Sequence, residues 1–232
     1  MKRSKPITNL LHADSDEPAT KTALALRELR SAIRSGRIHQ GQQLTIGELS
    51  EQLGMSHTPV REAVRTLQAE GLLQQTPHHI VTVITLSEKD VHDMYEVRQL
   101  LEPMATRLAM PHLTEGHFTT LQRLNEAIHE ADRKHDIDQR YALNHDWHFT
   151  LFACAQNRVL LSTITSLWQR FWWHTSWSMP DQADRSFAQH AAILDALRAS
   201  DAGLAEQLMR EHITDGQQRV LAHLSQQFAD AR

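Results

Sequence analysis

The first third of the chain carries three short helical patterns separated by turn residues. Between Thr20 and Gly36 the apolar positions fall near one helical face: Leu24, Leu26, Leu29 and Ile33. A second pattern, TIGELSEQL, ends at Gly54, and a third runs from about residue 56 to Gly71. Ser56, or Thr58 in its place, is expected to cap the third helix, and Pro59 stands in its first turn, where a missing N–H costs nothing.

Two β-rich runs follow in LLQQTPHHIVTVI, on either side of a Thr-Pro-His-His turn, and they predict a hairpin. The segment RIHQGQQL, before the second helix, is predicted to be a loop. Three helices plus a β-hairpin make a winged helix-turn-helix over residues 20–85. Residues 1–19 are polar and without periodicity, so we expect a disordered, mobile tail there.

Beyond this module only helical patterns occur. Ser87 and Asp90 have the spacing of a capping box and open the first of them. Helices are expected over 88–110, 115–134, 138–155, 158–178, 184–200 and 202–228. The predicted fold class is therefore mainly α, with an N-terminal winged helix-turn-helix followed by an all-α helical bundle over residues 86–232.

Composition narrows the class of protein. The 232 residues have 41% hydrophobic and 22% charged content, as an ordinary globular protein does. Cys154 is the single cysteine, so no intrachain disulfide can form, and we expect a cytoplasmic protein. No apolar run reaches membrane-spanning length and no secretory signal is expected, so no membrane partner is predicted. A net charge of −4 leaves room for DNA binding only through a local basic patch.

The segment SHTPVREAVRTLQAEGLL offers such a patch. The second helix of a helix-turn-helix enters the major groove, and its N-terminus suits phosphate. Arg61 and Arg65, one helical turn apart, could read a guanine edge and hold a phosphate. The alternative is that Arg61 pairs with Glu62 or Glu48 on a solvated helix.

These residues also carry a resemblance. LSEQLGMSHTPVREAVRTLQAEGLL resembles the N-terminal module of GntR-family bacterial transcription regulators. EVRQLLEPMATRLA and the helical patterns after it resemble the all-helical ligand-binding (FCD-type) domain of the FadR-like branch, in its smaller six-helix, VanR-like subgroup. The resemblance implies a homodimer on a palindromic double-stranded DNA operator, with a small organic acid as effector that relieves repression.

The DNA contacts that the resemblance implies lie at these positions: Arg34, Ser56, His57, Thr58, Arg61, Arg65 and His79. Some of them depart from the family's pattern. His57 stands where an arginine is usual, and His79 and Ile80 replace the arginine and glycine of the wing tip. Gly47 stands where a basic residue is common.

Asn144 and His148, four residues apart in NHDWHF, share one helical face, and His190 and His212 follow on later helices. Three imidazoles and an oxygen could bind a divalent transition metal such as Zn, Ni or Fe. Spacing alone carries little weight, because the 16 histidines of the chain give many accidental pairs. The resemblance implies a metal at these four positions, with a neutral Asn144 where Asp is usual.

The resemblance also implies an effector-binding cation at Arg98, whose alternative is an i, i+4 pair with Glu102. Trp168 and Trp172 lie in a tryptophan-rich segment, LWQRFWWHTSW, which can line an effector pocket or a dimer contact. The sequence does not separate these two roles.

Three other functions are considered. One is a metal-sensing regulator in which the ion itself is the signal. Another is a metalloenzyme-like helical domain attached to a DNA-binding head. The third is a structural nucleic-acid-binding protein without an effector. No HExxH motif and no nucleophile constellation occurs, so we expect no catalytic residues and no enzyme.

Overall fold

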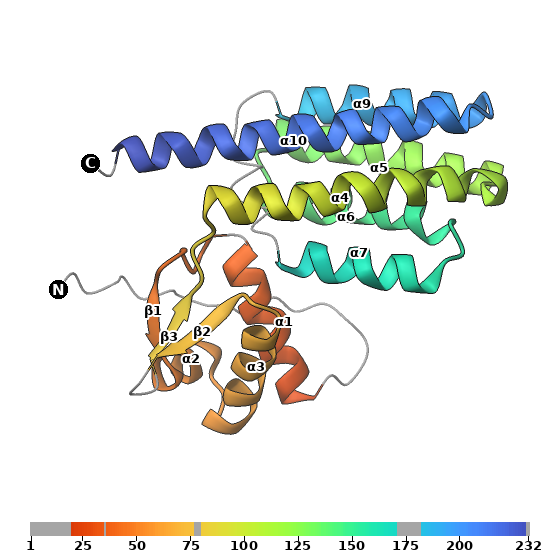
Figure 1. Cartoon of the computed structure of the whole chain (residues 1–232). Coiled ribbons are helices and arrows are strands. Elements are labelled where there is room, and N and C mark those ends of the chain that lie inside the picture. Colours follow the sequence, from red (N-terminus) through yellow and green to blue (C-terminus); the bar gives the residue numbers. More distant parts are fainter. Residues whose placement is uncertain (1–19, 35, 77–79, 171–181, 231–232) are drawn as a thin grey trace. The chain divides into compact units, whose positions relative to one another are not determined.

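The computed structural model of the chain describes residues 20–34, 36–76, 80–170 and 182–230 (Figure 1). Its internal contacts divide the chain into two compact units, residues 1–86 and 87–232. The fold is mainly α with one small sheet near the N-terminus, as predicted. The expected tail 1–19, His79 at the wing tip and Trp172 lie outside the described residues.

The N-terminal unit is a winged helix-turn-helix. Its helices are α1 (Lys21–Arg34), α2 (Ile46–Leu53) and α3 (His57–Ala69). Its strands are β1 (Gln43–Thr45), β2 (Leu73–Thr76) and β3 (Ile80–Val83), and they form an antiparallel sheet in the order β1-β3-β2. The core of this unit is made of buried apolar side chains from all three helices and the sheet: Ala25, Leu29, Ile33, Leu49, Leu53, Val60, Ala63, Val64, Leu67, Val81 and Val83.

Strand β1 corrects the prediction of a loop over RIHQGQQL. Leu44 pairs with Val81 of β3 and is buried, while Gln43 and Thr45 on either side are exposed. Three residues are too few to show the alternation that marks a strand, and the pairing partner lies far along the chain. The predicted hairpin forms, with Leu73 opposite Val83 and Thr76 opposite Ile80.

The turn between α2 and α3 is built from local signals. Thr45 and Glu48 form a capping box at the start of α2. Gly54 ends α2 with φ +62°, in the left-handed region that favours glycine, and its N–H donates to the last carbonyls of the helix. Ser56 then takes the N-cap position of α3 without a capping bond from its side chain. This short connection brings the N-terminus of α3 to the surface.

The C-terminal unit is a helical bundle (Figure 1). Its helices are α4 (Glu88–Ala109), α5 (Glu115–Arg133), α6 (Ile137–Ala153), α7 (Arg158–Arg170), α9 (Gln182–Arg198) and α10 (Ala202–Asp230). The predicted capping box at Ser87 and Asp90 forms at the start of α4. At Pro111 the chain passes through a 3-10 turn, Met110–His112, before α5. The described helices follow the expected ranges closely, and residues 171–178 of the predicted 158–178 helix lie outside the described part.

Packing in the described part of this unit brings α4, α5, α6, α7, α9 and α10 around one interior. Helix α4 packs against α10, α6 and α7, while α5 packs against α6 and α9, and α9 against α10. Large buried side chains fill the space between them: Tyr95, Leu121, Ile128, Trp147, Leu151, Phe152, Ile164, Trp168, Ile193 and Met209. Among the helices that the structure describes, none is both long and apolar enough to cross a lipid bilayer.

Candidate metal centre and nucleic-acid interface

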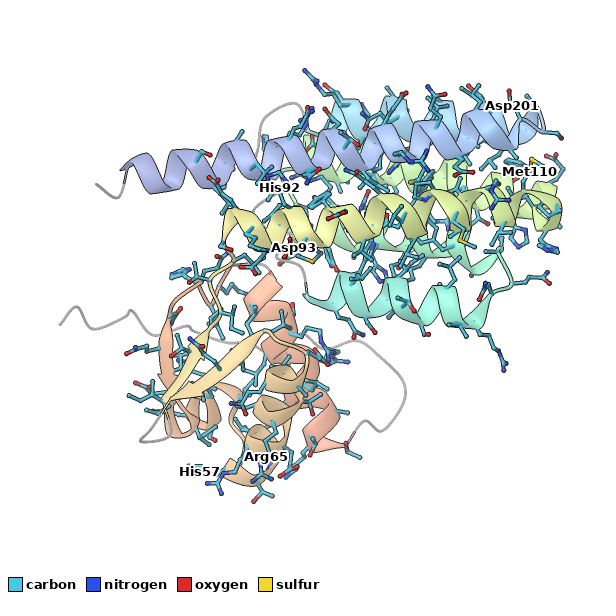
Figure 2. The ribbon with its side chains drawn as sticks, viewed as in Figure 1. His57, Arg65, His92, Asp93, Met110 and Asp201 are labelled. Carbon is cyan, nitrogen blue, oxygen red and sulfur yellow. The ribbon has the colours of Figure 1, made fainter. Side chains whose placement is uncertain are left out.

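The N-terminal end of α3 presents polar side chains to solvent. Ser56, His57, Thr58, Arg61 and Arg65 are all exposed, and His57 and Arg65 are marked in Figure 2. The opposite side of α3 is buried: Pro59, Val60, Ala63, Val64 and Leu67. This division leaves the first turns of α3 available to a groove of DNA and anchors the helix to α1 and α2.

The two arginines of α3 differ in their surroundings. Nη1 of Arg65 lies 2.9 Å from Oε1 of Glu62, in an exposed pair three residues apart on α3. Arg61 forms no ion pair within the described residues, so the alternative pairing with Glu62 or Glu48 is absent there. Arg34 is the last residue of α1. The helix-turn-helix is held to α1 by Arg30, whose Nη2 lies 2.5 Å from Oε1 of Glu70.

Three histidines from three helices meet inside the C-terminal unit. His148 of α6, His190 of α9 and His212 of α10 each offer a ring nitrogen, and these atoms lie within 4.8 Å of one another. The ring centroids of His190 and His212 are 4.9 Å apart, and those of His148 and His212 are 5.2 Å apart. His148 and His190 are fully buried, and His212 is partly buried.

Asn144 lies one turn before His148 on α6 and is 2% exposed. Its Oδ1 is buried and finds no hydrogen-bond partner among the described residues. The same is true of Nδ1 of His148 and Nε2 of His190. Buried polar atoms without partners are uncommon and costly, so these three atoms are available to bind a ligand.

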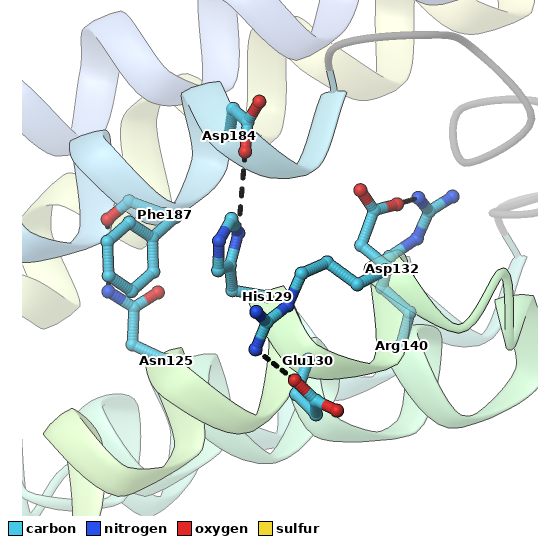
Figure 3. A network of polar contacts seen from close by, with 8 residues as sticks. Asn125, His129, Glu130, Asp132, Arg140, Asp184 and Phe187 are labelled. Carbon is cyan, nitrogen blue, oxygen red and sulfur yellow. Dashed lines mark hydrogen bonds and ion pairs between the residues drawn. The ribbon is translucent and has the colours of Figure 1, made fainter.

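Hydrogen bonds outside the cluster fix two of the imidazoles. Nδ1 of His190 lies 3.1 Å from Oδ1 of Asn125, and the Asn125 amide donates to the carbonyl of Phe187 at 3.0 Å. Figure 3 shows Asn125 of α5 beside Phe187 of α9. Nδ1 of His212 lies 2.7 Å from Oε1 of Gln189. An imidazole that donates through Nδ1 keeps the lone pair on Nε2, which is the form that binds a metal.

The interior keeps these imidazoles neutral. Burial, and then the charges of His190 and His212, hold the pKa of His148 well below its usual value. Burial, followed by His212, does the same for the pKa of His190. Burial and the nearby Arg98 guanidinium lower the pKa of His212 to about 4. Neutral imidazoles near pH 7 are the metal-binding form, so the residues present fit a divalent transition metal.

A second polar group borders the histidines. Nε of Arg98 lies 2.6 Å from Oε1 of Glu102, four residues on in α4, and both side chains are buried. Nε1 of Trp168 donates to the same carboxylate oxygen at 2.8 Å, and the Trp168 ring centroid lies 5.1 Å from that of His148. The pair of Arg98 with Glu102 therefore forms in the interior, beside the histidines, and not on the surface.

Asn125 and Gln189 were not predicted to belong to this site, and Glu102 was named only as the i, i+4 partner of Arg98. Asn125 was visible as a polar residue on the apolar face of α5, between buried Leu124 and Ile128. Trp147 stacks on His190, with ring centroids 3.8 Å apart. His145, three residues before His148 on α6, stacks on Phe149 and is not part of the three-histidine cluster.

Comparisons with known proteins agree with both units. Residues 22–82 match the bacterial regulatory proteins of the gntR family, and residues 93–215 match the FCD domain. The chain is 36% identical over 156 residues to an HTH-type transcriptional regulator in the TAR-I ttuE-ttuC' intergenic region of Agrobacterium vitis, covering 66% of this chain and 90% of that protein. It is 32% identical over 182 residues to a Paenarthrobacter nicotinovorans protein named as a probable D-xylose utilization operon transcriptional repressor, covering 78% and 80%.

A solved structure shows the same architecture. Escherichia coli McbR superposes with a TM-score of 0.76 at 28% sequence identity, covering 90% of this chain and 99% of that one. These relatives are transcription regulators and not enzymes. The chain therefore belongs to the GntR family of bacterial transcription regulators, in its FadR-like branch, with an FCD domain as its helical unit.

Proposed function

We propose that this regulator is a cytoplasmic, homodimeric repressor whose hold on its operator is weakened by a small organic acid bound at a metal in the helical domain. Residues 20–85 would bind a palindromic double-stranded DNA operator, one half-site per subunit. Residues 86–232 would bind the metal and the effector and form the dimer. The meeting of three imidazoles inside the helical unit is the observation that carries the proposal. Asn144, one turn before His148 on α6, adds a buried oxygen without a hydrogen-bond partner among the described residues.

Asn144, His148, His190 and His212 would hold the ion, with Zn, Ni or Fe as candidates. Nitrogen-rich donor sets with one oxygen suit these metals. When bound, the ion supplies a Lewis-acid centre that can accept a carboxylate oxygen. Arg98 and Trp168 border the same interior, and we propose that they contact the effector together with Trp172.

The DNA contacts would come from the exposed N-terminal face of α3 (Ser56, His57, Thr58, Arg61 and Arg65) and, as the resemblance implies, from Arg34 and His79. Arg61 has the clearest role, because it projects from the first turns without an ion-pair partner among the described side chains. Effector and operator must then weaken each other's binding by the same factor, since the coupling between two sites is reciprocal.

The experiment begins with metal analysis of the purified protein and of the His148→Ala and His190→Ala variants. His145→Ala is the matched control, because it removes a neighbouring imidazole that lies outside the cluster. We expect near-stoichiometric metal in the parent and the control, and loss of metal in the two variants. If the parent protein contains no metal, even after incubation with zinc or nickel, the proposed metal centre is wrong.

Operator binding is then measured by fluorescence anisotropy on a sequence selected from random duplex DNA, with the metal-loaded protein and a panel of carboxylic acids. An acid that weakens DNA binding by the factor by which DNA weakens acid binding supports the proposal. A change in DNA affinity on adding metal alone, with no acid having any effect, would identify the ion as the signal instead.

A further inference from the structure

The side chains that would hold the metal carry no charge of their own. His148 and His190 are buried and His212 partly so, an imidazole binds a metal ion in its neutral form, and Asn144 would contribute an amide oxygen. None of the four can offset a divalent ion. The donor set therefore leaves the full charge of the metal in the interior of the helical domain.

The charged neighbours do not offset it either, because they occur in opposite pairs. Arg98 lies against Glu102, with Nε and Oε1 2.6 Å apart. Arg219 lies against Asp215 on α10, with Nε and Oδ2 3.1 Å apart. Arg185 approaches Asp215 at 3.8 Å from a mostly solvent-exposed position.

Burying an uncompensated divalent charge is unfavourable, and such charges are paired in proteins. Three imidazoles and one amide oxygen would supply four donor atoms, and divalent ions such as Ni²⁺ or Fe²⁺ can accept further oxygen ligands. A ligand that supplies such oxygens and brings two negative charges would balance the site.

We infer that this centre selects a small dianion, a dicarboxylate in the first instance, over a monoanion of the same shape. The inference rests on the proposed function and narrows its effector class. Phosphate also carries about two negative charges, but in one compact group. The test therefore compares dicarboxylates with inorganic phosphate.

The test uses the full-length, nickel-loaded protein and isothermal titration calorimetry. Each dicarboxylate is paired with the acid in which one carboxylate is replaced by an uncharged amide: malonate with malonamate, succinate with succinamate, and glutarate with glutaramate. Inorganic phosphate is titrated separately, and nickel is quantified after every titration to exclude extraction of the metal. We expect at least one dicarboxylate to bind about tenfold or more tightly than its amide partner, which corresponds to ~1.4 kcal/mol.

A variant separates charge from shape. Asn144→Asp adds one negative charge among the ligands, so the preference for the dianion should shrink by about tenfold while nickel is retained. Gln139→Glu is the matched control, because it adds the same charge at an exposed position of the same helix and should leave the preference unchanged. Circular dichroism of both variants checks that the helices are intact.

The outcomes distinguish the inference from the proposed function. Equal binding of the members of every pair would overturn the inference and leave an acid effector standing. If nickel is retained but no acid and no phosphate binds, both the inference and the proposed effector fail. If inorganic phosphate binds and no dicarboxylate does, the selectivity for a dianion is supported and its assignment to dicarboxylates is overturned. An unchanged preference in Asn144→Asp would also overturn the inference, because charge would not be its cause.

Discussion

Nδ1 of His190 lies 3.1 Å from Oδ1 of Asn125, a residue of another helix and 65 positions earlier in the chain. The amide of Asn125 is itself oriented, because it donates to the carbonyl of Phe187 at 3.0 Å. Its Oδ1 is therefore turned towards His190 as an acceptor, and Nδ1 is the ring nitrogen of His190 that donates to it. The other nitrogen, Nε2, faces the cluster without a partner among the described residues.

Removing Asn125 should therefore weaken metal binding although Asn125 is not a ligand. Loss of a hydrogen bond that orients a metal-binding histidine typically lowers metal affinity about 10–100-fold. We expect a decrease in that range for Asn125→Ala, measured by competition with a chromogenic chelator. Gln122→Ala, at an exposed position one turn earlier on α5, should keep the parent's affinity. Equal affinities in the two variants would show that Asn125 has no orienting role.

The buried pair of Arg98 and Glu102 leads to a second prediction, about stability. Glu102 accepts from Arg98 at 2.6 Å and from Nε1 of Trp168 at 2.8 Å, and its side chain is fully buried. Glu102→Ala would leave the guanidinium without this carboxylate, and breaking a buried ion pair costs about 3–5 kcal/mol. Urea unfolding of the metal-free protein measures the change.

The same helix supplies the control for this measurement. Lys89 and Asp93 also form an i, i+4 pair on α4, but both side chains are exposed, and Asp93 is marked in Figure 2. Asp93→Ala should change the unfolding midpoint little, because solvent screens such pairs. A similar loss in both variants would contradict a special role for the buried pair.

Much of the fold was predictable because its signals are local. The glycine at 54, the Ser87–Asp90 box and the apolar periodicity each lie within one element or turn. Strand β1 was not predicted, because it is defined by its pairing with β3, almost 40 residues later in the chain. Three residues are too short a segment to show that pairing in the sequence. Local sequence patterns therefore predicted the helices well, but they did not predict strand pairing between distant segments.

The candidate metal site was only partly predictable from the sequence. Asn144 and His148 could be joined by their spacing on one helix, but bringing His190 and His212 to them required the family resemblance, because each lies on a separate helix. The bond from Trp168 to Glu102 spans 66 positions and has no local signal. Asn125 did have a signal, since an amide on the apolar face of an amphipathic helix needs a partner in the core.

Operator binding provides the third prediction. Arg61→Ala should lower affinity for the selected operator by about 1–3 kcal/mol, because we propose that this exposed arginine near the start of α3 contacts bases or phosphates. A base contact would change which sequences are selected, whereas a phosphate contact would reduce the salt dependence and weaken all sequences alike. Arg123→Ala, at an exposed position on α5, is the control and should bind like the parent.

Acid should destabilise the metal-free protein through its buried histidines. In the folded chain the pKa of His212 is lowered to about 4 by burial and by Arg98, and that of an unfolded histidine is near 6.5. Between these values the unfolded state binds the proton and the folded state does not, so stability is complete above pH 6.5 and falls as the pH drops towards 4. His212 alone accounts for up to about 3 kcal/mol of this loss, and His148 and His190 add to it in the same direction.

His212→Gln tests the sign and the source of this dependence. The variant removes one group that takes up a proton on unfolding, so its unfolding free energy should depend on pH less steeply between pH 6.5 and 4. Urea titrations of the metal-free parent and variant at half-unit pH steps give both slopes, and His117→Gln on α5 serves as a histidine control outside the cluster. If the His212→Gln slope matches the parent's, or the parent gains stability on acidification, His212 is not held neutral by its surroundings.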